Sequence, residues 1–200
     1  YHLAEPSAPF PAIRRNVVEL PLQYKSGVTM WTPETVPNFD NFMPGLYLGI
    51  RMSWYTKADP QAILTEFYAK FYGAAAGPMR DYWQSADDAW TTVPVHAGCG
   101  FSYLRRFTGE RMTALRKNMD AALAACKTAI EYQRVKLADD NLRQFELFMK
   151  MRRDLYSGKF DALAGDADRW KATNKALGDE YQQNYAFTGH AFAAETVSAL

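Results

Sequence analysis

The distribution of proline constrains the fold of this chain more than any other feature. Eight of the ten prolines fall within the first 60 residues, and only Pro78 and Pro94 follow. Proline fixes φ and lacks a backbone donor, so it interrupts long helices and central strands. We therefore expect loops, short strands and short helices over residues 1–58, and a different architecture from Asp59 onward.

Helix signals begin at Asp59, which can cap a helix that starts at Pro60 and stops at Gly73. Apolar residues at helical spacing then predict four further segments. They start near residue 78, at residue 108, at about residue 131 and near residue 163. The pattern leaves open whether the segments from residues 108 and 131 form one long helix. We predict an α-helical bundle domain over residues 59–185 and an extended tail over residues 186–200.

One segment in the proline-rich part reads as a strand. Residues 27–32 (GVTMWT) are β-branched and aromatic, begin with a glycine and end at Pro33. A single strand cannot form a sheet, so its neighbours are expected to lie outside this chain. The fold class that follows is mainly α, with a small β contribution confined to the first 35 residues.

Composition argues against several classes of protein. Formal net charge is +1, from 23 basic and 22 acidic residues without long runs of one sign, which argues against nucleic acid or an anionic membrane as partner. No stretch approaches the ~20 apolar residues of a membrane-spanning helix. Aromatic residues make up 14% of the chain, a share that serves either a core or a sugar-binding platform. Two cysteines, Cys99 and Cys126, fit neither a zinc site nor a disulfide scaffold and favour free thiols.

Several short motifs, in a fixed order, carry a resemblance. Residues 27–34 (GVTMWTPE) resemble the final strand and following loop of a glycosidase-type barrel. Residues 47–54 (YLGIRMSW), 58–60 (ADP) and 67–75 (FYAKFYGAA) resemble a bacterial family of unknown function that is similar to the alpha-glucuronidases and hexosaminidases. The resemblance covers about residues 1–90. It implies an upstream catalytic barrel, and a helix that ends at the aromatic stretch near residue 54.

On this resemblance, residues 1–58 form the last strands and loops of a β/α barrel. Strand seven lies at the N-terminus, a helix follows over residues 13–24, and strand eight covers the segment after Gly27. Barrel active sites lie at the C-terminal ends of the strands. That position brings His2, Glu5, Trp31 and Glu34 near the mouth of the expected barrel.

Two of these residues are acids, and glycoside hydrolysis requires a pair of carboxylic groups. Glu5 and Glu34 stand at predicted strand ends. The interpretation we favour places both on the rim, because the catalytic acids of similar barrels lie on earlier strands, upstream of this chain. If either acts, Glu34 is the better catalytic candidate, and Trp31 could stack on a sugar face beside it.

Other polar residues have weaker claims. His2 could bind a substrate hydroxyl or cap a strand, and Asn41 belongs to a loop that could hold a ligand or form an ordinary turn. His96 and His190 have no partner at metal-ligand spacing, so no metal and no cofactor are expected. The acidic pairs at residues 87–88 and 139–140 are predicted to be solvated on helix surfaces.

The functional expectation is therefore the C-terminal portion of a carbohydrate-active protein, most naturally a glycoside hydrolase, that supplies one wall of a pocket and a helical buttress. Its partners would be a glycan or glycoside and the remainder of the same polypeptide. The alternative is a non-catalytic helical binding or scaffold module. The chain starts at Tyr1 without a signal peptide, so we expect either that a leader has been removed or that the sequence starts within a longer protein. We expect a bacterial secreted or periplasmic location.

Overall fold

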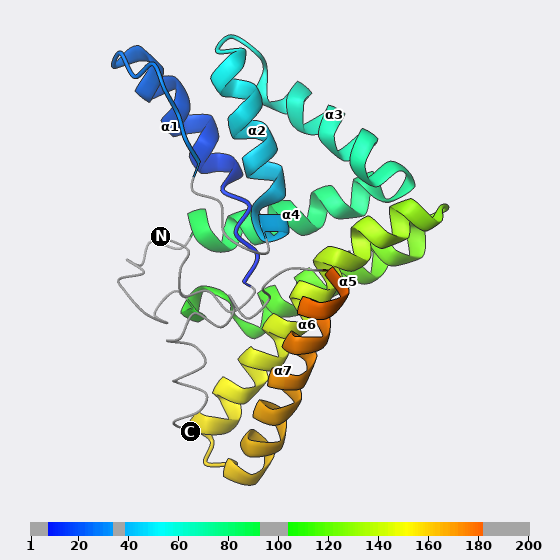
Figure 1. Cartoon of the computed structure of the whole chain (residues 1–200). Coiled ribbons are helices and arrows are strands. Elements are labelled where there is room, and N and C mark those ends of the chain that lie inside the picture. The colour runs from blue at the N-terminus through cyan, green and yellow to red at the C-terminus, as the bar shows by residue number, and fades with distance from the viewer. Residues whose placement is uncertain (1–7, 34–38, 93–103, 182–200) are drawn as a thin grey trace.

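A computed structural model describes residues 8–33, 39–92 and 104–181, and within these ranges the chain is mainly helical and forms no strand (Figure 1). The α-helices are α1 (Ile13–Lys25), α2 (Met43–Trp54), α3 (Pro60–Tyr72), α4 (Ala76–Thr91), α5 (Gly109–Ala125), α6 (Ala129–Tyr156) and α7 (Phe160–Tyr181). Two short 3₁₀ helices, η1 (Phe39–Phe42) and η2 (Gly73–Ala75), precede α2 and α4.

The helix boundaries predicted around residues 59–73 are confirmed. The Asp59 carboxylate accepts a hydrogen bond of 3.0 Å from the backbone N–H of Gln61, and Pro60 is the first helical residue. Gly73 follows the last turn of α3 with φ of 53°, a conformation that residues with a Cβ rarely adopt. The helix expected over residues 13–24 is also present, as α1.

The segments from residues 108 and 131 are two helices. Thr108 caps α5, and the chain leaves helical geometry at Cys126. Thr128 then starts α6 with a capping box, in which its hydroxyl accepts from the N–H of Glu131 while the Glu131 carboxylate accepts from the N–H of Thr128. The resulting turn reverses the chain between two long helices.

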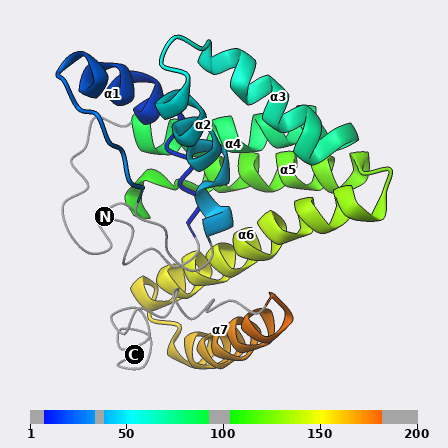
Figure 2. The same ribbon diagram turned by 45° about the horizontal axis from the view of Figure 1, so that its top comes forward.

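Each helix packs against the next one along the chain, so the order in sequence is largely the order in space. Figure 2 shows α1, α2 and α3 on one side of α4 and α5, with α6 beneath them and α7 on the far side of α6. Longer-range contacts tie this arrangement together: α1 also meets α4, α3 also meets α6, and η1 and η2 both meet α6.

Aromatic side chains fill the centre of the core. Trp83 is 1% exposed and donates its indole N–H to the hydroxyl of buried Tyr72 at 3.1 Å. Phe67 lies among the rings of α2 and α3, with its centroid 5.1 Å from that of Tyr47. The same buried cluster includes Leu48 of α2, so apolar residues from both sides of the predicted boundary at residue 59 share it. The division of the chain into domains there stays a prediction.

The expected strand at residues 27–32 is absent, which corrects that prediction. Residues 28–33 form no regular element, Val28 is 45% exposed and Met30 is 80% exposed. A strand needs a neighbour to satisfy its backbone groups, and the described ranges provide none. The other expected strand, at the N-terminus, and the predicted tail over residues 186–200 lie outside the described residues.

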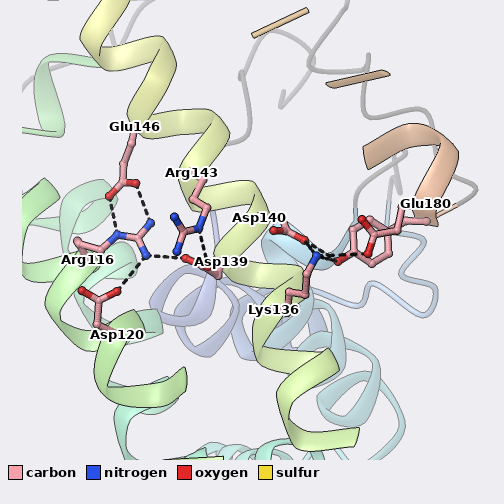
Figure 3. Close-up of polar contacts among 9 residues, drawn as sticks. Arg116, Asp120, Lys136, Asp139, Asp140, Arg143, Glu146 and Glu180 are labelled. Atoms are coloured by element: carbon pink, nitrogen blue, oxygen red, sulfur yellow. Dashed lines mark hydrogen bonds and ion pairs between the residues drawn. The ribbon is translucent and has the colours of Figure 1, made fainter. Parts of the chain in front are cut away.

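The prediction that both acidic pairs are solvated is wrong for Asp87 and for both members of the second pair, since the Asp140 side chain is 12% exposed and pairs with Lys136. Asp139 is 4% exposed and forms ion pairs with Arg116 at 2.5 Å and Arg143 at 2.7 Å (Figure 3). Asp87 is 1% exposed and accepts hydrogen bonds from the start of α1. Both carboxylates are buried because donors from another part of the chain come to meet them.

Candidate ligand-binding cleft between α1 and α2

The N-terminus of α1 is fixed by a buried carboxylate on α4. Asp87 accepts hydrogen bonds from the backbone N–H of Ile13 at 2.8 Å and of Arg14 at 3.2 Å. Burial raises the pKa of this carboxyl, although the two backbone N–H groups act in the opposite direction. An acceptor at this end of α1 satisfies donors that have no partner within the helix. Asp87 thereby sets the position of α1 on α4.

Two glycines on α2 let neighbouring segments approach its backbone. Gly45 and Gly49 are one helical turn apart, on one face of α2. A Cβ added at Gly45 would lie 1.8 Å from the carbonyl oxygen of Pro11. A Cβ at Gly49 would lie 2.5 Å from Cη2 of Trp31. This face of α2 therefore receives the chain before α1 and the indole that follows α1.

A cleft of about 380 Å³ opens between α1, α2 and the segment after α1. Its polar lining comes from one side of α1, where Arg15, Glu19 and Gln23 follow each other at intervals of one turn, with Asn16 beside them. Its apolar lining includes Trp31, Pro33, Phe10, Phe42 and Leu46. The cleft thus combines aromatic surface with amide, guanidinium and carboxylate groups.

The charged groups in the cleft are already paired. Arg15 Nε donates to Glu19 Oε2 at 2.9 Å, and both side chains are about half exposed. Asn16 Nδ2 donates to the carbonyl oxygen of Gly45 at 2.8 Å and links α1 to α2. Gln23 has an uncharged amide, which can donate and accept. This arrangement suits a neutral, hydroxyl-rich ligand better than a strongly charged one.

Trp31 lies between two cavities. Its side chain lines the cleft described above and also a second one of about 270 Å³, which α1, residues 28–29 and the end of α2 enclose. One edge of the indole packs on Gly49, and the side chain is half-buried. The ring is therefore held in place by α2 while parts of it remain open to ligand.

The structure separates the predicted site residues. Trp31 lies in the cleft, whereas Asn41 is 7% exposed and its side-chain N–H donates to Asn141 Oδ1 on α6 at 3.4 Å. Asn41 also accepts a 2.9 Å bond from the N–H of Phe10 through its backbone carbonyl. His2, Glu5 and Glu34 lie outside the described residues.

Sequence reasoning missed the contribution of α1 to this cleft. The signal was present, because polar residues at positions 15, 19 and 23 follow the helical period and form a stripe on one face. The resemblance to a barrel gives this helix only the role of a connection between two strands. In the sequence alone, this stripe has the same pattern as a solvated helix face, and only the position of Trp31 against α2 marks it as the wall of a cleft.

Within the described ranges, no group of three or more His, Cys, Asp or Glu side chains is placed to hold a metal ion. No helix within these ranges is both long enough and apolar enough to cross a bilayer. Cys126 is a half-buried free cysteine whose thiol donates to the carbonyl of Ala122 at 3.3 Å, and burial raises the pKa of this thiol; Cys99 is outside the described residues.

A family model described as a domain of unknown function (DUF4838) matches residues 1–84. The match supports the resemblance of the N-terminal part to a family of unknown function, and it includes every residue that lines the cleft. It ends within α4. No curated protein and no solved structure matches the chain.

Proposed function

We propose that this chain is the C-terminal portion of a carbohydrate-active protein, in which the cleft between α1 and α2 binds part of a glycan. The observation that carries the proposal is the position of Trp31, an anchored indole beside a row of hydrogen-bonding side chains on α1. An apolar ring face with polar groups at its edge matches the two surfaces of a sugar ring. The helices beyond α3 act as a buttress for this wall.

The catalytic acids, if the whole protein is a glycoside hydrolase, come from elsewhere. Among the described residues of the cleft, Glu19 is the one carboxylate, and it is ion-paired with Arg15. Hydrolysis requires two carboxylic groups with different protonation states. We infer that the remainder of the polypeptide supplies them, as the resemblance to glycosidase-type barrels implies, and that the protein is bacterial and secreted or periplasmic.

The segment after α1 has features that suit contact with the upstream polypeptide. Val28 and Met30 are exposed at 45% and 80%, and the segment contributes to the walls of both clefts. Exposed apolar residues with backbone groups outside regular structure are suited to strand pairing with another part of a protein. We propose that this segment, which forms no strand in the described chain, pairs as the last strand of a β/α barrel only when the upstream polypeptide is present.

A second candidate is a non-catalytic helical binding or scaffold module. The exclusively helical architecture of the described ranges and the pairing of Glu19 favour it. The two candidates share the glycan-binding cleft but differ in hydrolysis. Release of sugar from aryl glycosides by the protein with its native upstream sequence supports the hydrolase. Binding without release supports the module.

The test of the cleft is a comparison of two tryptophans. Trp31→Ala and the milder Trp31→Phe should weaken binding of neutral glycosides, such as those of N-acetylated amino sugars, measured by calorimetry. Loss of a stacking platform costs roughly 1–3 kcal/mol by analogy with bases on aromatic rings, or about 5- to 150-fold in affinity. Trp54→Ala is the matched control, because Trp54 is 82% exposed and does not line the cleft.

Gln23→Ala provides a second variant with little effect on packing, since Gln23 is partly exposed and lines both clefts. We expect weaker binding with an unchanged melting temperature. Equal affinities of the native protein, Gln23→Ala and Trp31→Phe for every glycoside that binds would overturn the assignment of this cleft.

A further inference from the structure

Helix α7 is attached to α6 by polar contacts at both ends of their interface. At one end, the Tyr181 hydroxyl donates to Asp140 Oδ2 at 2.6 Å, and Lys136 Nζ reaches both groups (Figure 3). At the other end, Lys150 on α6 pairs with Asp166 on α7. Between the two ends, the ring of Phe148 lies 6.5 Å from that of Trp170. These contacts fix the antiparallel register of the two helices.

That register brings two buried amides to the same place. On α6, Gln144 lies one turn from Asp140 and one turn from Phe148, both of which contact α7. On α7, Asn174 lies one turn beyond Trp170, on the way to Tyr181. By this register Gln144 and Asn174 fall at the same level in the middle of the interface, and Trp170 lies one turn from Asn174.

Three polar atoms at this level are buried without a hydrogen-bond partner. They are Gln144 Oε1, Asn174 Oδ1 and Trp170 Nε1, and their residues are 2%, 5% and 2% exposed. Buried polar groups in folded proteins are almost always satisfied, because an unmade bond costs the full desolvation of the group. Three such atoms in one interface indicate that a bound molecule supplies the missing partners.

The chemistry of the three atoms defines that molecule. Two carbonyl oxygens require donors and disfavour an anion, while the indole N–H requires an acceptor and disfavours a cation. The ligand must therefore be neutral and able to donate twice and accept at least once. Water has this combination, and internal waters in proteins typically make about three hydrogen bonds.

We propose that one buried water molecule is bound between α6 and α7, donating to Gln144 Oε1 and Asn174 Oδ1 and accepting from Trp170 Nε1. The water makes the centre of the interface selective for one register. A shift of α7 by one turn would move Asn174 and Trp170 away from Gln144 and leave all three groups unsatisfied. The site is independent of the cleft between α1 and α2.

The proposal is tested on the full chain by NMR. We expect a cross-peak between the indole N–H of Trp170 and a water that resides long enough to give a negative nuclear Overhauser effect. The indole signal is assigned by its loss in Trp170→Phe. A crystal structure should show a water within hydrogen-bond distance of all three atoms. A direct bond between Trp170 Nε1 and either amide oxygen, with no water, would overturn the proposal.

Variants test whether the two amide oxygens, and not the burial of the indole alone, hold the water that gives the cross-peak. Gln144→Met combined with Asn174→Leu removes both acceptors at similar side-chain size and should abolish the cross-peak. Gln133→Met is the matched control, since Gln133 is an exposed residue of the same helix. Should the double variant fail to fold, the measurement on the native chain still decides. A cross-peak that survives in a folded double variant would contradict the assignment of the two amides as ligands.

Discussion

The two ends of this chain use buried charge to different extents in assembling their helices. Around α1–α4, aromatic rings and backbone hydrogen bonds hold the elements together, as in the contact of Tyr47 with Phe67 and the capping of α1 by Asp87. Across α5–α7, charged side chains bridge the helices, and Figure 3 shows two such networks on α6. Packing by shape tolerates little change in volume, whereas packing by charge responds to pH and salt.

The centre of the first network is Arg116. Its guanidinium donates two parallel bonds to Glu146, at 2.9 and 2.7 Å, and a third of 2.5 Å to Asp139, which also pairs with Arg143. Burial of the guanidinium disfavours its charge, yet the bonds from Glu146 and Asp139 outweigh burial and raise the pKa of Arg116. A single cation thus joins α5 to two turns of α6.

The largest effect is expected from Arg116→Met. Removing one partner of a buried ion pair leaves the other charge uncompensated, which typically costs about 3–5 kcal/mol. Arg116 is 23% exposed and Asp139 keeps Arg143, so we expect about 2–3 kcal/mol from urea unfolding. Asp139→Asn in the Arg116→Met background should recover part of this loss. A urea midpoint of unfolding for Arg116→Met equal to that of the native protein would show that the network does not hold α5 to α6.

The next effect compares two neighbouring aspartates. Asp87→Ala should cost roughly 1–3 kcal/mol, because two N–H donors at the start of α1 lose their acceptor within the protein. Asp88→Ala should cost less than about 0.5 kcal/mol, since its ion pair with Arg14 is exposed. Hydrogen exchange at the amides of α1 provides the local readout. Similar losses for both variants would mean that α1 does not depend on the Asp87 cap.

The smallest effect concerns acid stability at Glu131. Backbone N–H groups of Lys127 and Ala74 lower the pKa of this carboxyl from 4.5, so its contribution to stability is present above about pH 4.5 and is lost as pH falls through the folded-state pKa. Glu131→Gln should therefore flatten the pH dependence of the urea midpoint below pH 4.5. Glu110→Gln, in the first turn of α5, is the control. A Glu131→Gln curve parallel to that of the native protein at every pH would show that the pKa shift is absent.

Local signals in the sequence predicted the helices after Asp59 well, and partners distant in sequence explain the failures. Asp59, Pro60 and Gly73 determine their ends of α3 through contacts within a few residues. The burial of Asp87 depends instead on Ile13, which lies 74 residues away, so a pair of adjacent acids looked like a solvated surface. The strand assigned to residues 27–32 failed for a related reason, because strand formation depends on a neighbour that the described ranges do not contain.

The candidate site shows the same division. The residue type of Trp31 and its place at the end of a predicted strand indicated a site residue, and Trp31 does line the cleft. Asn41 was selected on the same grounds, but Asn141, 100 residues further along, takes it into the core. The polar stripe on α1 became recognisable only once α2 and Trp31 were seen to face it.

The close approach of Trp31 to Gly49 has an evolutionary consequence. A methyl group at position 49 would overlap the indole, so the two positions cannot change independently while the ring keeps its place. Related sequences with this arrangement should show covariation, with a larger residue at 49 only where 31 is small. The order of substitutions then matters, because loss of the indole permits a side chain at 49, and that side chain in turn prevents the indole from returning.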